Sequence, residues 1–589
     1  MLTGTFIILI ENARLEGEST TIVVDGMSCL RYMYGDLPWI PGGQVKEFVE
    51  NVKDFAMRFI SLGAELVFYF DGPPAEVKID EWKRRRLETM DKINNLMDKL
   101  NAGVPASSLE GSDWQVLPPN IGTLSGVVLK EIGCKVIRSI GECDEEISRY
   151  AYQNRCLAIL GQDTDFVIYP GARHYWSVKH FNKHNMTTLE YSGRKLASML
   201  YLRFDQLPLL ATLLGNDIIR REDLRSFHHS FANRYYTPRN VSFYKTVHNV
   251  AGFIRRYPSG DELTPYLRQL AHQVFHDESK WTLLQDSIQS YNITQQPKDD
   301  LECQTGIENW DTVLRLARDM HISGATPQLY GAIVRGIYNC STCLEDYRLD
   351  DLPPNQVILR KLRQKIYGIL LYDKPKVGDE PHVVRELAVS GPRSIDSYAS
   401  NPAIPPRVPH PGLVALWSND NLLEDMRWDL LCDAVDIDHR LVRDSGIPLR
   451  LAIFVLTLKY LMDEGMKLQM FELNALISSA VVLVDYNSEK LKRLPLDPLD
   501  TRALRLFTLV ARSYGSLILL NSSCGNPIPA QDANSHNYQD GKLYHQTYRM
   551  SKNGSKISEL CEHRINHIEV FNAIFSILPV DKAVTPVAV

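Results

Sequence analysis

The chain has 589 residues, of which 44% are hydrophobic and 23% are charged, an ordinary composition for a soluble globular protein. Its net charge of −6 gives no global attraction to nucleic acid, so any such binding must use a local patch. The ten scattered cysteines favour a reducing, intracellular compartment over a disulfide framework. The apolar run 5–10 lacks the flanks of a signal peptide, and the apolar segments 451–462 and 503–520 are too short or carry arginines, so we expect no membrane span.

Strand-like and helix-like segments alternate from residue 20 to about residue 225. Four apolar, β-branched runs predict strands at 20–26, 65–72, 134–140 and 156–160. Helical periodicity predicts helices at 44–63, 121–131 and 141–153. Strands separated by helices favour βαβ units, so the predicted fold class is α/β, with a mostly parallel sheet flanked by helices in a domain at 1–225.

The sequence changes character after residue 225. Residues 226–374 are predicted to form a helical extension with an irregular linker, and the proline-rich segment 375–412 is predicted to be a linker or surface arm. Residues 413–578 are strongly apolar with helical periodicity, which predicts an α-helical C-terminal domain with core helices at 450–462 and 471–484. The tail 579–589 is expected to be flexible.

Acidic side chains follow each predicted strand of the N-terminal domain. The carboxyl ends of parallel strands meet at one edge of a sheet, where ligands bind, so these acids are expected to converge there. Clustered carboxylates raise each other's pKa unless a cation compensates them, and Mg²⁺ or Mn²⁺ prefers such oxygen ligands. The candidate metal ligands are Asp25, Asp71, Glu142, Asp144, Asp163, Asp165 and Asp217.

Each of these acids has a simpler interpretation when it is taken alone. Asp-Gly after a strand, as at Asp25, is a common turn, and Asp144 can cap a helix. The stretch Asp163-Thr164-Asp165 can also be turn chemistry. As a group, the carboxylates can instead hold two metal ions about 3.5–4 Å apart, which would activate water and stabilise the leaving oxygen in phosphodiester hydrolysis. The convergence of seven acids favours the metal site.

The motifs VVDG, FDG, GECDEE, GQDTD and LLGND occur in this order over residues 20–225. This set resembles the flap-endonuclease (XPG-like, PIN-like) nuclease family, and the resemblance implies that the matching acids bind two magnesium ions. It also implies that a basic helix after the second strand contacts the scissile phosphate, and the basic residues at that place are Lys83, Arg84, Arg85 and Arg86. The same run is also typical of a solvated helix face or a nuclear-import signal.

Two departures separate the chain from active members of that family. The family begins with Met-Gly-Val-x-Gly-Leu, whereas this sequence reads MLTGTFIILIENA, and the segment after LLGND lacks the glycine-containing helix–hairpin–helix that grips duplex DNA. We therefore expect metal binding to be retained more readily than duplex cleavage. Enzymatic activity stays open: an active protein would be a Mg²⁺-dependent phosphodiesterase with branched or single-stranded RNA or DNA as its partner.

A narrower resemblance covers nearly the whole chain. Its motifs are TIVVDGMSCLRY, DEWKRRRL, CLAILGQDTDFVIY, DQLPLLATLLGNDII, GSLILLNSSCGNP and QDGKLYHQTY. They are similar to the family of the constitutive coactivator of peroxisome proliferator-activated receptor gamma. The resemblance implies a nuclear protein that enhances transcription through protein interactions. Its partners would be nuclear receptors of the peroxisome proliferator-activated receptor gamma, estrogen receptor and retinoid X receptor types.

Two short motifs have a functional and a structural interpretation. Residues 210–214, LATLL, match the Leu-x-x-Leu-Leu pattern by which helices dock into receptor grooves, but a helix leading directly into the Asp217 site is expected to be buried. Cys340 and Cys343 form a lone CxxC pair, whereas a structural zinc site needs two further ligands. The absence of GxGxxG and Walker A loops argues against a nucleotide cofactor.

Overall fold

The computed structural model divides the chain into two compact units that interleave along the sequence. The first unit comprises Met1–Tyr32, Ala56–Asp71 and Gly141–Lys298, and the second comprises Met33–Phe55, Gly72–Ile140 and Asp299–Val589. The structure describes residues 2–73, 78–111, 115–231, 243–293, 306–324, 328–340, 344–346, 352–376, 378–391, 394–418 and 420–585. The predicted domains are consecutive ranges, and this division of the chain stays a prediction.

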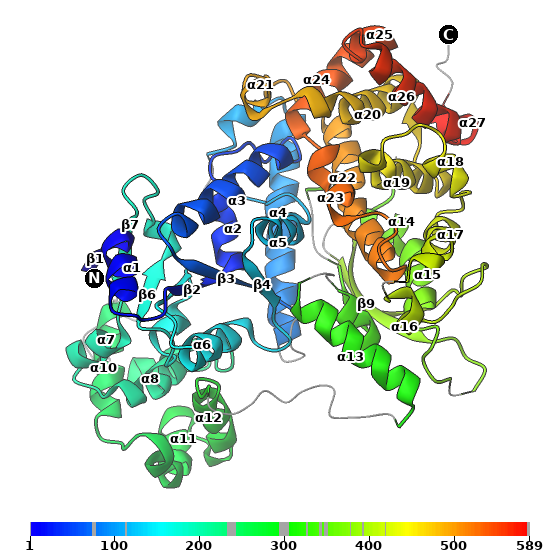
Figure 1. Cartoon of the computed structure of the whole chain (residues 1–589). Coiled ribbons are helices and arrows are strands. Elements are labelled where there is room, and N and C mark those ends of the chain that lie inside the picture. Colours follow the sequence, from blue (N-terminus) through cyan, green and yellow to red (C-terminus); the bar gives the residue numbers. More distant parts are fainter. Residues whose placement is uncertain are drawn as a thin grey trace. The chain divides into compact units, whose positions relative to one another are not determined.

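The first unit is built on a mostly parallel sheet, as the sequence predicts (Figure 1). Its strands are β1 (Leu2–Thr5), β2 (Thr21–Asp25), β3 (Glu65–Phe70), β5 (Ala158–Gly161), β6 (His174–Ser177) and β7 (Thr187–Tyr191). They follow the order β1-β7-β6-β5-β2-β3. The four strands β6, β5, β2 and β3 are parallel, and β7 and β1 add antiparallel pairs. The carboxyl ends of the parallel strands therefore share one edge.

Helices flank this sheet and extend the first unit towards residue 293. They are α1 (Phe6–Leu15), α6 (Cys143–Gln153), α7 (Gly193–Met199), α8 (Leu207–Leu214), α9 (Arg225–Ser230), α10 (Phe243–Ile254), α11 (Leu267–Phe275) and α12 (Trp281–Gln289). Helix α6 contacts β2, β3 and β5. Helix α8 packs against α10 and α12, which form a second apolar cluster with their neighbours. The predicted helical extension is thus confirmed over its described first part.

The second unit is mainly helical and has one large apolar core. Its longer helices after residue 300 are α13 (Glu308–Ile322), α15 (Arg360–Leu370), α17 (Glu424–Ala434), α19 (Ala452–Asp463), α20 (Met470–Val482), α22 (Thr501–Ser523), α24 (Gly541–Lys552) and α26 (Ile565–Ile577). Earlier in the chain it contains α4 (Ile79–Asn101), α5 (Ile121–Glu131) and β4 (Lys135–Arg138). The periodic apolar segments 450–462 and 471–484 correspond to α19 and α20, so the helical C-terminal region is confirmed.

Contacts distant in sequence explain why segment 33–55 belongs to the second unit. A Cβ on Gly42 would lie 2.3 Å from the ring of Phe507, and one on Gly541 would lie 2.4 Å from the backbone oxygen of Pro41. Lys46 Nζ donates to the Leu483 backbone oxygen at 3.1 Å. Only glycine allows the close approaches at positions 42 and 541. Such contacts join residues hundreds of positions apart, which the predicted consecutive division does not anticipate.

The prediction for 375–412 is wrong in its secondary structure. Strands β9 (Val383–Gly391) and β10 (Ser394–Pro402) pair antiparallel, and β8 (Ile337–Asn339) adds a parallel strand to β9. The flanking prolines directed the prediction towards a linker, but the run between them alternates exposed and buried residues at 383–386. The predicted flexible tail begins with α27 (Val580–Ala583), whose Ala583 is buried.

One helix among the described residues, α22, is long and apolar enough to cross a membrane by length and composition. However, 89% of its apolar window is buried inside the protein. Its Arg505 and Arg512 side chains are buried as well, and Arg505 donates to the Leu352 backbone oxygen at 3.0 Å. The helix therefore serves as a core element of the second unit.

Candidate functional site

Two predicted metal ligands lie where β2 and β3 end. Asp25 is the last residue of β2 and is buried, and its Oδ1 accepts a hydrogen bond from the Ser28 backbone at 3.1 Å. Asp71 follows β3 directly and is exposed. Glycine at 161 lets β5 come close, because a Cβ there would lie 3.3 Å from the Cβ of Asp25. The parallel sheet thus positions the first carboxylates as the sequence predicts.

Helix α6 supplies a second pair of acids. Glu142 is its N-cap residue and makes no side-chain capping hydrogen bond, and Asp144 lies in the first turn. Carboxylates are favourable at a helix N-terminus because they interact with the unpaired backbone N–H groups and the helix dipole. This local stabilisation opposes the cost of a charge at Asp144, which comes first from burial and then from the other acids of the site.

The Asp163-Thr164-Asp165 stretch forms the start of a short 3₁₀ helix, Thr164–Val167. Asp163 is its N-cap and accepts a hydrogen bond from the Asp165 backbone at 2.9 Å. Turn chemistry is therefore present in this stretch. It does not exclude a ligand role, since one bond to a backbone N–H leaves most of the carboxylate lone pairs available.

The carboxylates interact strongly enough to change one another's protonation. Burial, together with the charges of Asp71 and Asp163, raises the pKa of Asp25 to about 6, and hydrogen bonds from Ser28 oppose this rise. Burial also raises the pKa of Asp144 to about 9, together with the charges of Asp163, Asp25, Asp71 and Glu142. Five of the seven predicted ligands therefore form one electrostatic cluster, named here the acidic cluster: Asp25, Asp71, Glu142, Asp144 and Asp163.

The other two predicted ligands, Asp165 and Asp217, lie beside Tyr291. The Tyr291 hydroxyl donates to Asp165 Oδ2 at 3.4 Å, and the charges of Asp165 and Asp217 both raise the pKa of Tyr291, after burial as the larger cause. In the part of the chain that the structure describes, no group of three or more His, Cys, Asp or Glu side chains is arranged ready to hold a metal ion. The metal-ligand assignment of the seven acids accordingly stays a prediction.

The predicted phosphate-contacting residues lie on α4, and acids of the same helix pair with them. Arg84 Nη2 and Arg85 Nε lie 2.6 Å and 2.7 Å from Glu81 Oε1, and Arg84 Nη1 lies 2.5 Å from Glu88 Oε1. Lys83 Nζ lies 3.9 Å from Asp80, and the Arg86 guanidinium lies over the ring of Trp82. Hydrogen bonds from Arg84 are the main reason that the pKa of Glu81 falls to about 2. Phosphate contact by this helix stays a prediction.

The two short motifs have different outcomes. Leu210 and Leu213 of LATLL are buried on α8 in the core of the first unit, so this segment does not present a docking face in this fold. Cys340 is buried, and Cys343 lies outside the described residues. For LATLL the expectation of a core helix is confirmed.

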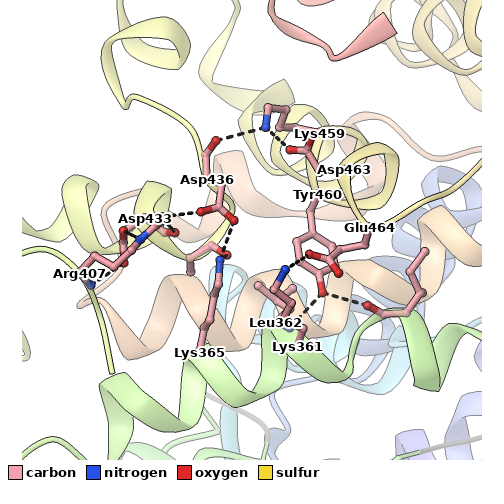
Figure 2. Close-up of polar contacts among 12 residues, drawn as sticks. Lys361, Leu362, Lys365, Arg407, Asp433, Asp436, Lys459, Tyr460, Asp463 and Glu464 are labelled. Atoms are coloured by element: carbon pink, nitrogen blue, oxygen red, sulfur yellow. Dashed lines mark hydrogen bonds and ion pairs between the residues drawn. The ribbon is translucent and has the colours of Figure 1, made fainter. Parts of the chain in front are cut away.

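The second unit contains a cavity of about 180 Å³ between α15, residues 404–407 and the end of α17. Figure 2 shows Lys365 and Arg407 pointing towards Asp433 and Asp436 around this hollow. Lys365 Nζ lies 2.7 Å from Asp436, and Arg407 lies 2.8 Å from Asp433 and 2.5 Å from Asp436. Sequence patterns do not predict this network, because its members come from three segments that no periodicity links. Here each carboxylate has a cationic partner.

Comparison with known proteins identifies relatives along the chain. A bovine (Bos taurus) protein named constitutive coactivator of peroxisome proliferator-activated receptor gamma is 26% identical, over 95% of this chain and 90% of its own length. The human (Homo sapiens) protein of the same name is 35% identical over 38% of this chain and 24% of its own length. The chain is a homologue of these coactivators. A family model described as FAM120A-like domain also matches residues 200–295, the region that contains α8 to α12.

Two solved structures with partial similarity are complexes with DNA. The catalytic core of Rad2 in complex with a DNA substrate is 15% identical, with a TM-score of 0.25 over 49% of this chain and 95% of that one. Human GEN1 in complex with Holliday junction DNA is 14% identical, with a TM-score of 0.29 over 63% of this chain and 77% of that one.

Proposed function

We propose that this protein is a nuclear coactivator that enhances nuclear-receptor-dependent transcription through protein interactions. The observation that carries the proposal is the length of the similarity to a constitutive coactivator of peroxisome proliferator-activated receptor gamma, which spans 95% of this chain and so includes segments of both units. That receptor is the first partner, and receptors of the estrogen and retinoid X types are further partners.

The fold determines which variants can map the receptor-binding surface. Removing 413–589 would strip α22 and α24 from the segment around Gly42, so a truncation would test folding as well as docking. Point changes at exposed apolar side chains avoid this problem. Leu422 and Ile565 are 89% and 74% exposed in the second unit, and Met199 is 72% exposed in the first. Exposed large apolar residues are normal individually, and they become informative when their replacement removes binding.

The test is co-precipitation of the full-length chain with the ligand-binding domain of peroxisome proliferator-activated receptor gamma. Wild type is expected to be recovered, and Leu422→Asp or Ile565→Asp is expected to reduce the recovery, since a charge in an apolar contact must be desolvated. Met199→Asp is the matched control and is expected to bind as wild type does. Failure to recover the wild type would overturn the proposal.

A second function is favoured by the acidic cluster. The raised pKa values of Asp25 and Asp144 mean that these carboxylates lie in a place where their charges are poorly compensated. Structural carboxylates are normally paired with a cation or with several donors. We propose that the cluster binds divalent cations, Mg²⁺ or Mn²⁺, and thereby nucleic acid.

The donor set fits such cations, because it consists of carboxylate oxygens, the ligands that Mg²⁺ and Mn²⁺ prefer. Asp25, Asp144, Asp163 and Asp165 would be the central ligands, and Asp71, Glu142 and Asp217 would complete the coordination. When bound, a pair of ions supplies an activated water and stabilises the leaving oxygen of a phosphodiester. Lys83, Arg84, Arg85 and Arg86 of α4 are the proposed phosphate contacts.

Two measurements test this second function. Mn²⁺ binding, followed by the loss of its free electron paramagnetic resonance signal, is expected for the wild type and is expected to be abolished by Asp25→Asn with Asp144→Asn. Magnesium-dependent cleavage of flap, hairpin and single-stranded substrates then separates a nuclease from a protein that only binds. The metal-binding proposal fails if the wild type takes up no Mn²⁺.

A further inference from the structure

The segment that follows α12 places a buried tyrosine, Tyr291, beside two predicted metal ligands, Asp165 and Asp217. Tyr291 is 4% exposed, and its hydroxyl donates to Asp165 Oδ2 at 3.4 Å while accepting from Asn216 Nδ2 at 3.4 Å. Asn216 belongs to the LLGND stretch, whereas Tyr291 lies 75 residues later in the chain. Sequence patterns predict residues 226–374 only as a helical extension with an irregular linker, so they give Tyr291 no role.

Several contacts hold Tyr291 in place. Its ring lies against that of Tyr169, with centroids 5.2 Å apart, and the Tyr169 hydroxyl donates to the Ser290 backbone oxygen at 3.2 Å. Two residues later, the Ile293 backbone oxygen accepts from Arg149 Nε of α6 at 3.0 Å. The segment around Tyr291 is thus held by Tyr169 on one side and by Arg149 of α6 on the other, which restricts the position of the hydroxyl.

Asn216 is equally constrained. Its Oδ1 accepts from the backbones of Ile218 and Ile219 at 3.1 Å and 2.9 Å, which closes the loop that carries Asp217. Its Nδ2 donates to Ser287 Oγ at 2.9 Å, and Ser287 Oγ lies 2.8 Å from Thr212 Oγ1 of α8. A chain of hydrogen bonds therefore runs from α8 through Ser287, Asn216 and Tyr291 to the Asp165 carboxylate.

We propose that Tyr291 is a positioning residue for the divalent-cation site, where its hydroxyl fixes the orientation of the Asp165 carboxylate. The inference rests on the second proposed function. The hydrogen bond from Tyr291 restricts the rotation of the Asp165 carboxylate, and it occupies one of about four lone-pair positions on that group. Outer-shell partners of this kind typically change metal affinity 10–100-fold when they are removed.

The experiment measures Mn²⁺ affinity of the full-length protein by electron paramagnetic resonance. Tyr291→Phe keeps the ring against Tyr169 and removes only the hydroxyl, and we expect its Mn²⁺ affinity to fall about tenfold. Tyr257→Phe is the matched control, because it removes a hydroxyl that donates to Gln273 at 2.8 Å in the same helical region. Its Mn²⁺ affinity is expected to equal that of the wild type.

A double-mutant cycle with Asp165→Asn distinguishes positioning from a general loss of structure. In the Asp165→Asn background, Tyr291→Phe is expected to have no further effect on Mn²⁺ affinity, because the group that it orients is already lost. Melting temperatures in chelator check that the variants are folded. Equal Mn²⁺ affinity of the wild type and Tyr291→Phe would overturn the inference alone. A wild type that binds no Mn²⁺ would overturn the second proposed function and this inference with it.

Discussion

Carboxylates have opposite charged neighbours in two regions of the molecule. These are the acidic cluster of the first unit and the network of Lys365, Arg407, Asp433 and Asp436 in the second unit. Around the cavity of the second unit, Lys365 and Arg407 lie within 2.8 Å of Asp433 or Asp436 (Figure 2). At the sheet edge of the first unit, Asp25 and Asp144 have other carboxylates as their main charged neighbours, and their pKa values rise to about 6 and about 9.

The difference separates structural charge from functional charge. A carboxylate with a cation from its own chain gains Coulomb energy that offsets its desolvation, and such a network needs no external ligand. A group of carboxylates without that compensation reduces stability and is retained where it binds something. The comparison predicts that changes in the paired charges of the second unit's core affect folding alone, whereas changes in the acidic cluster alter the response to divalent cations and to pH.

The largest effect is expected at the most buried ion pair of the second unit. Arg363 Nε and Nη2 each lie 2.7 Å from a Glu386 oxygen, and both side chains are almost fully buried. Arg363→Met would leave Glu386 buried without this partner, so we expect a loss of about 3–5 kcal/mol in the free energy of unfolding. Urea denaturation of the full-length chain measures this loss.

The control for this change is Arg440→Met. Arg440 pairs with Asp438 at 2.9 Å, but both side chains are exposed. The expected loss of stability is much smaller than for Arg363→Met, because solvent screens exposed ion pairs. If Arg363→Met lowered the free energy of unfolding as little as Arg440→Met does, the buried Arg363–Glu386 pair would not stabilise the second unit as the comparison predicts.

The sequence predicts the strands and helices of the acidic site well for a physical reason. Buried β-branched runs such as 65–72 carry their own signal, and acids at their ends are fixed by strand direction, which is how Asp25, Asp71 and Asp163 could be grouped. Tyr291 has no comparable signal. Its place depends on how α12 packs against α8, and no local pattern encodes a contact that spans 126 residues to Asp165.

The second unit shows the same limit of local information. Apolar periodicity predicts α19 and α20, but the β9–β10 hairpin lies between prolines that favour a linker. The pairing of β9 with β8 follows from tertiary contacts, including the Arg363–Glu386 pair that buries a charged residue inside a strand. A buried glutamate in a sequence is read as exposed unless its partner is known.

The next effect concerns magnesium and the stretch at 163–165. Asp163→Asn with Asp165→Asn is expected to remove the stabilisation by added Mg²⁺, which for the wild type would be about 2.7 kcal/mol at a hundredfold excess over the dissociation constant. Asparagine keeps the N-cap at position 163, so the backbone turn is preserved. Melting temperatures with Mg²⁺ and with chelator measure the response.

The same double variant sharpens the comparison without metal. Relief of carboxylate repulsion is expected to make it slightly more stable than the wild type in chelator. Asp205→Asn is the control. Asp205 does not belong to the acidic cluster, it is exposed, and its carboxylate lies 3.3 Å from Arg203 Nε. A double variant that gained as much stability from Mg²⁺ as the wild type does would show that the stretch is only a turn.

The pH dependence of the metal-free protein follows from Asp144. Its pKa is about 9 in the folded protein against an ordinary value of 3.8, so between about pH 4 and pH 9 the folded state keeps a proton that the unfolded state releases. Stability therefore falls as pH rises through this window, by at most about 1.4 kcal/mol per pH unit for one proton. Asp144→Asn is expected to flatten this fall in urea denaturation with chelator, whereas Asp205→Asn should follow the wild-type slope. Parallel slopes for Asp144→Asn and the wild type would remove the pH argument for the cluster.

The smallest effect on stability is expected on α4, where paired cations are predicted to serve a ligand. Glu81 holds both Arg84 and Arg85, whereas Glu88 holds Arg84 alone. Glu81→Gln is expected to lower the free energy of unfolding by less than about 0.5 kcal/mol, because exposed helix pairs contribute little.

The same change leaves two guanidinium groups without this competing carboxylate, so affinity for single-stranded DNA should rise a few-fold at low salt and converge on the wild-type value at high salt. Glu88→Gln should have a smaller effect, since it withdraws a partner from one arginine only. Fluorescence anisotropy of labelled DNA over a salt series measures both variants. If Glu81→Gln bound DNA no better than the wild type, the basic run on α4 would be a solvated helix face, and its charges would belong with the self-compensated network of the second unit.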